Sequence, residues 1–370
     1  MPSPRPSTPP ISCQPLVDKI AGRGTAMNPA NRFERLHLEP DPDAEADPGA
    51  AYDEQPDPRT EFYDDASESL LTYNDSPDIP FTVGLNVYRG CEHGCAYCYA
   101  RPTHEYLGWS SGLDFETRIL VKKRAPELLR RELAHPRWEP QSVAMSGVTD
   151  CYQPAERHFR LTRACLEIFA EFRNPVGVIT KNFLITRDRD LFADFVRWNG
   201  ISAYLTITTL DAELAGKLEP RAARPEHRLR AIRLLADAGV PVGVMVAPII
   251  PGLTDHEIPA ILDAAKAAGA RRAGYVVLRL PFSVKTIFSQ WLDAHAPGKK
   301  DRILSRVRDL RGGKLNVSEW GARMRGEGVF AEQIHDLFAV AARRTGLKQE
   351  RSHLSTAHFR RPGGVQMNLF

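Results

Sequence analysis

Residues 79–282 alternate between short apolar runs and longer amphipathic stretches, a pattern typical of strands alternating with helices. Most of the apolar runs are rich in β-branched residues, as expected for strands that are covered on both faces. The predicted strands are 81–88, 142–146, 176–180, 203–208, 240–246 and 274–278. The predicted helices between them are 125–133, 160–172, 188–198, 225–238 and 258–268.

This alternation predicts an α/β fold. Because β-α-β connections are right-handed, six such units form a partial (βα)6 barrel of parallel strands over residues 79–282. Functional sites of such barrels lie at the C-terminal ends of the strands. After residue 282 the pattern is helical, over 284–294, 299–310 and 330–345, and predicts a C-terminal helical cap (residues 283–347). Residues 348–370 are predicted to form a flexible tail.

The first 78 residues are rich in proline and acidic residues and predict a disordered arm. Translation could start at Met27 instead of Met1. Residues 31–80 contain 15 Asp or Glu and three Arg, a local charge of −12, whereas residues 81–370 carry +13. A basic core suggests an anionic partner such as DNA or RNA, and a solvated acidic tail on an ordinary enzyme is the alternative.

Membrane insertion and export are not expected from this sequence. No apolar run approaches the roughly 18–20 residues that cross a bilayer, and the first 30 residues lack the apolar region of a secretory signal. The six cysteines are too few to form the disulfide scaffold of a chain of this size. We therefore predict a cytoplasmic protein, where a reducing environment protects its thiols.

Three of the cysteines, Cys91, Cys95 and Cys98, are spaced C-x3-C-x2-C directly after the first predicted strand. Three thiolates on one tight loop can hold an iron–sulfur cluster and leave one coordination position open. A structural zinc site closes with four ligands, so zinc would need His93 or His104 as well. Buried, inert thiols are a further alternative. An iron–sulfur cluster is the interpretation that we favour.

The stretch 86–108, NVYRGCEHGCAYCYARPTHEYLG, resembles the cysteine loop of the radical S-adenosylmethionine (SAM) superfamily. It is most similar to a bacterial group related to spore photoproduct lyase, and the resemblance covers residues 31–345. It implies a 4Fe-4S cluster on the three cysteines, with SAM bound to the open iron. An electron donor such as flavodoxin or ferredoxin would supply the electron that cleaves SAM to a 5′-deoxyadenosyl radical, since the cofactors carry the chemistry.

The resemblance also implies SAM contacts at the ends of the predicted strands. The candidates are Tyr97, Thr149, Asp150, Lys181, Thr206, Thr208 and Ala247. For any single threonine, a hydroxyl group satisfied within its own strand is an equally good interpretation.

Further candidates lie beside these positions. Cys151 stands where the similar proteins usually have proline, and it is either a hydrogen donor to a product radical or a neutral substitution, which we favour. Arg221 could bind a carboxylate or phosphate, or form a surface ion pair. The polar residues Tyr152, Gln153 and Glu156 bind substrate or cap the following helix.

Two C-terminal segments are candidates for binding an anionic substrate or a partner protein. Arg323 and Arg325 lie in a glycine-rich loop that could contact an anionic substrate or be a solvated turn. The final residues, Gln366 to Phe370, resemble the Q-x-x-L-F peptide that docks bacterial repair proteins on the sliding clamp, although five residues often match by chance.

The favoured function is therefore a radical SAM enzyme that repairs or modifies DNA or RNA. One alternative is the same radical chemistry on a peptide or small molecule. An alternative from another class is a zinc or Fe–S protein that binds nucleic acid without catalysis.

Overall fold

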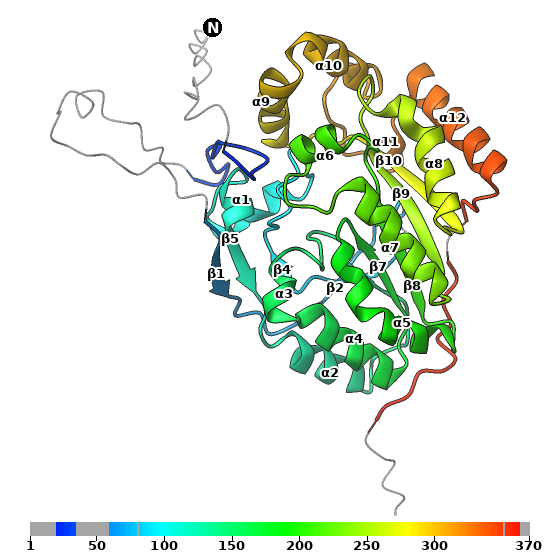
Figure 1. The fold of residues 1–370 in the computed structure, drawn as a ribbon. Coiled ribbons are helices and arrows are strands. Elements are labelled where there is room, and N and C mark those ends of the chain that lie inside the picture. Colours follow the sequence, from blue (N-terminus) through cyan, green and yellow to red (C-terminus); the bar gives the residue numbers. More distant parts are fainter. Residues whose placement is uncertain (1–19, 35–58, 80, 351, 363–370) are drawn as a thin grey trace, which may run out of the picture.

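A curved sheet of seven strands forms the centre of the molecule (Figure 1). The computed structural model describes residues 20–34, 59–79, 81–350 and 352–362. Six strands are parallel and confirm the predicted partial barrel. In spatial order they are β10 (Arg272–Val277), β9 (Val242–Ile249), β8 (Ile201–Thr206), β7 (Val176–Thr180), β6 (Val143–Met145) and β3 (Val83–Leu85). A short strand, β2 (Leu71–Tyr73), adds antiparallel to β3 at the edge.

The connections between these strands are amphipathic helices that pack on the sheet. They are α2 (Ala125–Ala134), α4 (Leu161–Phe172), α5 (Arg189–Val196), α7 (Pro225–Asp237) and α8 (Ile258–Ala267). Their apolar faces and the strands form one buried cluster that includes Leu129, Phe169 and Ile232. Parallel strands need this cover because their apolar side chains project from both faces of the sheet.

The first predicted strand, 81–88, is wrong in its extent. β3 ends at Leu85, and the chain then enters a second sheet through β4 (Tyr88–Arg89), which pairs with β5 (Arg118–Val121). β1 (Glu61–Asp64) completes this second sheet. The side chain of Asn86 fixes the change of direction, because its oxygen accepts hydrogen bonds from Val148 N (3.0 Å) and Thr149 N (3.2 Å). The three cysteines consequently follow the second sheet.

The predicted disordered arm, residues 1–78, also needs correction, since parts of it belong to the fold. Residues 20–34, which we call the N-terminal strap, lie against the loop that carries the cysteines and beside α1 (Asp114–Thr117) (Figure 1). Gly24 N donates to Glu116 Oε2 (2.9 Å), and Leu113 N donates to Met27 O (2.9 Å). The strap contains few large apolar residues and is held mainly by such hydrogen bonds, which composition does not reveal. Residues 1–19 and 35–58 lie outside the described residues.

The C-terminal helices lie in two places. α9 (Val284–His295) and α10 (Lys300–Asp309) share a buried apolar cluster with Cys95 and Tyr97. After the short α11 (Ala322–Arg325), the long α12 (Val329–Thr345) packs beside α8 in the outer helical layer (Figure 1).

The predicted flexible tail is ordered in its first part. Residues 352–362 run along the N-terminal ends of the strands, where Ser355 N donates to Asn199 O (3.0 Å) and Arg360 N donates to Phe172 O (2.8 Å). The clamp-like peptide, Gln366 to Phe370, lies outside the described residues.

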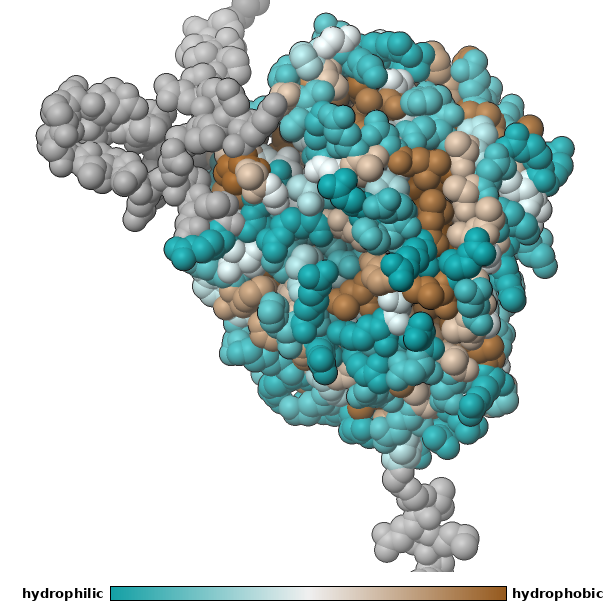
Figure 2. Space-filling model, in the orientation of Figure 1, coloured by the Kyte–Doolittle hydropathy of each residue, from teal (hydrophilic) through white to brown (hydrophobic). Residues whose placement is uncertain are grey.

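The described part of the chain contains no helix that is long and apolar enough to cross a membrane. The face seen in Figure 2 is largely hydrophilic, with smaller hydrophobic areas between the polar side chains.

The contact between the strap and the cysteine-bearing loop gives a first prediction. A Cβ atom at Gly24 would lie 1.6 Å from Gly94 O, so Gly24→Ala must displace one of the two backbones. We expect the free energy of unfolding to fall by about 1–3 kcal/mol. Thermal and urea unfolding measure this change.

The matched control is Gly216→Ala in α6 (Ala212–Leu218), where no atom lies within 4 Å of the added Cβ. This change should stabilise the protein by roughly 0.5–1 kcal/mol, because alanine favours the helix. Equal stability of the Gly24→Ala variant and the unchanged protein would contradict the docking of the strap.

Candidate active site

Three free thiols lie close together on residues 90–98, which we call the cysteine loop. Cys91 and Cys95 are buried, and Cys98 is partly exposed. Burial raises the pKa of all three thiols, and Asp150 and the Cys95 thiol raise the pKa of Cys91 further. A bound metal centre would remove this cost, because thiolate ligands are stabilised by the positive charge of the metal.

The donor set fits a centre with three protein ligands better than a four-ligand zinc site. His93 faces Asp150, with 3.4 Å between Nδ1 and Oδ2, and its Nε2 lies 3.1 Å from Asn182 Nδ2. His104 packs against Trp109 and Phe115, and burial lowers its pKa to about 3. Within the described ranges, no three His, Cys, Asp or Glu side chains are close enough to hold a metal ion as they stand. A single metal ion needs its ligands closer together than a 4Fe-4S cluster does, because each thiolate of the cluster binds a different iron atom.

A buried ion pair holds the cysteine loop from one side. Arg101 and Glu116 are both fully buried and pair through Nη2 and Oε1. Arg101 also donates from Nε to Cys95 O (3.0 Å) and from Nη1 to Gly112 O (2.8 Å). Because Glu116 also accepts the hydrogen bond from Gly24, the pair joins the cysteine loop, α1 and the N-terminal strap.

The segment after β6 holds the cysteine loop from a second side. Gln153 accepts a hydrogen bond from Glu92 N (2.9 Å) and donates to Gly90 O (3.1 Å). Asp150 accepts from Thr180 Oγ1 (2.7 Å) and Lys181 N (2.8 Å), and thus ties the end of β6 to the end of β7. Burial would raise the pKa of Asp150, but His93 and these hydrogen bonds lower it to about 2.

Glu219 is the centre of a third buried group of polar contacts. It accepts hydrogen bonds from the hydroxyl groups of Tyr97 and Thr208 (2.7 Å for Thr208) and pairs with Arg228. Burial would raise the pKa of Glu219, but Arg228 and then Lys181 bring it down to about 2. These contacts therefore fix the side chain of Tyr97, which lies between Cys95 and Cys98 in the cysteine loop.

Several predicted SAM contacts meet around this group. Thr208 Oγ1 also lies 3.0 Å from Ala247 O, so the ends of β8 and β9 meet here. The Lys181 ammonium group lies 5.9 Å from the centre of the Tyr97 ring. In the part of the chain that the structure describes, no carboxylate oxygen lies within 4.0 Å of this ammonium group. Lys181 thus has charge available for a ligand.

Two predicted contacts have partners within the protein. The Thr149 hydroxyl donates to Tyr88 O (3.0 Å), where β4 begins. Thr206 is buried, and its carbonyl accepts from Arg228 Nη1 (2.9 Å). For Thr149, the structure therefore agrees with a hydroxyl group whose hydrogen bond is made within the protein.

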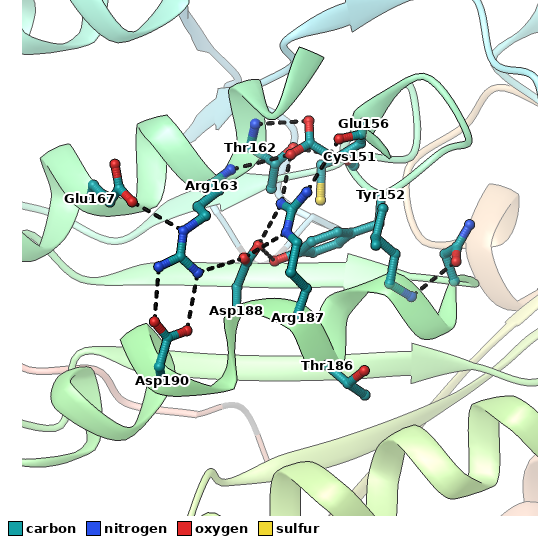
Figure 3. A network of polar contacts seen from close by, with 12 residues as sticks. Cys151, Tyr152, Glu156, Thr162, Arg163, Glu167, Thr186, Arg187, Asp188 and Asp190 are labelled. Atoms are coloured by element: carbon teal, nitrogen blue, oxygen red, sulfur yellow. Dashed lines mark hydrogen bonds and ion pairs between the residues drawn. The ribbon is translucent and has the colours of Figure 1, made fainter. Parts of the chain in front are cut away.

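The candidate hydrogen donor Cys151 directly follows Asp150 and is buried. Its thiol is only 2% exposed and belongs to the main apolar cluster. Its carbonyl accepts from Thr162 Oγ1 (2.5 Å), and Figure 3 shows it within a network around Glu156, Arg187 and Asp188. The burial of this thiol favours the interpretation of Cys151 as a neutral substitution.

The polar residues after Cys151 also serve the fold. Glu156 accepts hydrogen bonds from Thr162 N (3.0 Å) and from the Tyr88 hydroxyl (2.6 Å), so it caps α4. The Tyr152 hydroxyl donates to Asp188 Oδ2 (3.0 Å) (Figure 3). Arg221 forms an ion pair with Glu92 of the cysteine loop (2.9 Å), which makes it a support of the loop.

Sequence reasoning missed four residues that hold this site: Arg101, Glu116, Glu219 and Arg228. Each is a buried charged residue that is paired within the fold. Nothing in their local sequence distinguishes them from ordinary surface residues.

Comparison with known proteins gives the family. The model of the radical SAM superfamily matches residues 85–265, which carry the cysteine loop and the strands from β6 to β9. The chain is 36% identical over 234 residues to the uncharacterized protein Rv2578c of Mycobacterium tuberculosis, covering 63% of this chain and 68% of that protein. It is 34% identical over 176 residues to the uncharacterized protein MJ0683 of Methanocaldococcus jannaschii, covering 47% and 62%.

Solved structures of spore photoproduct lyase share the fold. A mutant form of the lyase has a TM-score of 0.59 at 15% sequence identity, covering 78% of this chain and 81% of the lyase. A complex with dinucleoside spore photoproduct has a TM-score of 0.58 at 14% identity, covering 78% and 80%. The parallel barrel, the cysteine loop after its first strands and the match to the family model agree, and the chain belongs to the radical SAM superfamily.

Proposed function

We propose that the protein is an enzyme that binds a 4Fe-4S cluster through Cys91, Cys95 and Cys98, cleaves SAM reductively and acts on DNA or RNA. The observation that carries the proposal is the gathering of three free thiols on one loop at the C-terminal ends of a parallel sheet. When bound, such a cluster supplies the electron that cleaves SAM to methionine and a 5′-deoxyadenosyl radical.

The protein's own residues would hold SAM and exclude water. The Lys181 ammonium group, which lacks a close carboxylate among the described residues, suits the SAM carboxylate. Ala247 and Thr208, at the neighbouring strand ends, suit the nucleoside. The strap, α9 and α10 cover the cysteine loop, and this cover would shield a radical from competing reactions.

Two observations support a nucleic-acid substrate over a peptide. Residues 81–370 carry a net charge of +13, which favours a polyanion. The lyase with the similar fold was solved with a dinucleoside spore photoproduct bound, which supports a nucleic-acid lesion as a substrate of a barrel with this fold.

The cluster ligands give a prediction. After anaerobic reconstitution, the unchanged protein should hold about four iron atoms per chain. With SAM and dithionite it should form 5′-deoxyadenosine. Changing any one of the three ligands, for example Cys95→Ala, should abolish 5′-deoxyadenosine formation, because the cluster loses a thiolate. Iron analysis, the visible absorption of the cluster and chromatography of the nucleoside measure these effects.

The control is Cys165→Ala in α4, a buried cysteine outside the cysteine loop. This variant should retain the iron content and the 5′-deoxyadenosine yield. Zinc in place of iron, with no 5′-deoxyadenosine from the unchanged protein, would rule out the proposed chemistry.

Lys181 gives a prediction about SAM. Lys181→Met should weaken SAM binding about tenfold while iron content stays constant, because one charge-assisted hydrogen bond is lost. Equilibrium dialysis of the reconstituted protein measures the dissociation constant. Lys123→Met is the control, since Lys123 is exposed and pairs with Asp64 in the second sheet. Equal SAM affinity of the two variants would remove Lys181 from the site.

The substrate class has its own test. We expect 5′-deoxyadenosine formation to increase when ultraviolet-irradiated DNA or RNA is added, relative to a protein substrate such as casein. A nucleic-acid substrate gives a hydrogen atom to the radical, which forms 5′-deoxyadenosine, so more SAM is cleaved. If no nucleic acid, irradiated or not, changes the yield, the nucleic-acid part of the proposal is wrong and the radical chemistry is unaffected.

A further inference from the structure

A partly buried arginine that has no oxygen partner among the described residues lies at the mouth of the barrel. Arg279 follows β10, and its guanidinium lies 5.1 Å from the centre of the Tyr99 ring, one residue after Cys98. Arg279 Nη1 lies 3.5 Å from Met324 Sδ, which is a weak acceptor. Its Nε is buried and has no hydrogen-bond partner. Among the described residues, no oxygen atom accepts a hydrogen bond from this side chain.

The surroundings of Arg279 are positively charged. Arg311 is buried beside it, donates from Nη2 to Leu278 O (2.9 Å), and has an Nε without a partner. Burial and then the charge of Arg279 lower the pKa of Arg311 to about 10, and burial followed by Arg323 lowers the pKa of Arg279. Positive charges that are buried together are costly unless an anion joins them.

Two carboxylates face this group, and neither reaches Arg279. Asp78 is engaged by Arg323, whose Nε lies 2.7 Å from Oδ2, and by Gly321 N (3.1 Å). Glu327 acts on Arg311 and is itself exposed. The Arg279 guanidinium therefore has donors that meet no oxygen acceptor among the described residues and can bind a ligand.

The aromatic side chains nearby indicate which kind of anion fits. Tyr99 is 49% exposed, and its hydroxyl donates to Gly147 O (2.6 Å), which fixes the ring at the rim. Trp320 is 62% exposed next to Gly321, which binds Asp78. Exposed rings beside an arginine can stack on bases while the guanidinium binds the backbone phosphate.

We propose that Arg279 binds a phosphate group of the nucleic-acid substrate at the rim of the barrel, with Tyr99 stacking on an adjacent base. This inference rests on the proposed function and adds a substrate site to it. The position of Tyr99 directly after Cys98 brings that phosphate close to the cysteine loop. The phosphate site would lie on the β10 side of the barrel. It is separate from Lys181, which follows β7 and is the proposed SAM contact.

The test compares Arg279→Met with the unchanged protein in binding a fluorescein-labelled single-stranded 12-mer, using the reconstituted enzyme with SAM. Fluorescence anisotropy at several salt concentrations gives the affinity. We expect about tenfold weaker binding, as one charge-assisted contact is lost. The slope of log affinity against log salt should fall by about 0.7. Arg279→Lys should recover part of the affinity, because it keeps the charge and loses the planar fork.

The matched control is Arg197→Met. Arg197 follows α5 at the opposite, N-terminal end of the strands and is 81% exposed, so its loss should leave oligonucleotide affinity unchanged. Thermal unfolding separates binding from a structural role. Because Arg279 gives up no hydrogen bond to oxygen, Arg279→Met should unfold at the same temperature as the unchanged protein or higher. A large fall in that temperature would assign Arg279 a structural role and overturn the proposal.

The remaining outcomes are distinct. Equal oligonucleotide affinity in Arg279→Met and the unchanged protein overturns the phosphate site, as does a parallel loss of SAM affinity, which would assign Arg279 to SAM. If the unchanged protein binds no oligonucleotide, calorimetry with pyrophosphate decides. Pyrophosphate binding that requires Arg279 supports the anion site for a small phosphorylated substrate and removes the nucleic-acid part of the proposed function. Absence of Arg279-dependent binding of either probe overturns the site.

Discussion

The buried ion pair between Arg101 and Glu116 is the contact on which the geometry of the cysteine loop depends. Removing two charges from water costs several kcal/mol for each ion, and only full use of their hydrogen-bonding groups offsets that cost. Arg101 uses its remaining donors on the carbonyl groups of Cys95 and Gly112, and Glu116 uses its second oxygen on Gly24. One pair therefore joins the cysteine loop to α1 and to the N-terminal strap.

The buried thiols of the same site lie beside negatively charged carboxylates. Asp150 raises the pKa of Cys91, and Glu219 raises the pKa of Cys95, each after the larger effect of burial. Carboxylates beside buried thiols oppose thiolate formation, so the loop is poorly suited to stay as free thiolates. A positively charged centre reverses this balance, since it stabilises the thiolates and is attracted by both carboxylates. On the β10 side the unbalanced charge is positive. There the buried Nε atoms of Arg279 and Arg311 have no hydrogen-bond acceptor among the described residues.

The sequence allowed prediction of the parts that depend on local patterns. The strand 176–180 and the other β-branched runs are predictable because a buried parallel strand needs continuous apolar residues, and the cysteine spacing indicates the loop that carries three free thiols. The strap was not predicted because hydrogen bonds of its backbone hold it in place. Such bonds do not depend on the amino-acid composition of the segment. Glu219 was not predicted because its burial depends on contacts between elements, among them the hydrogen bond from Tyr97, 122 positions away in the chain, and the ion pair with Arg228.

The C-terminal segment has a consequence for the order of folding. Residues 352–362 form hydrogen bonds with residues just before several strands, as in the hydrogen bond from Asn199 Nδ2 to His353 O, between residues 154 positions apart. The Arg361 guanidinium reaches Trp138 O across 223 positions. Contacts of such long range form late, because the chain between them must first be ordered. During synthesis, therefore, the N-terminal ends of these strands are covered only after residues 352–362 have been made.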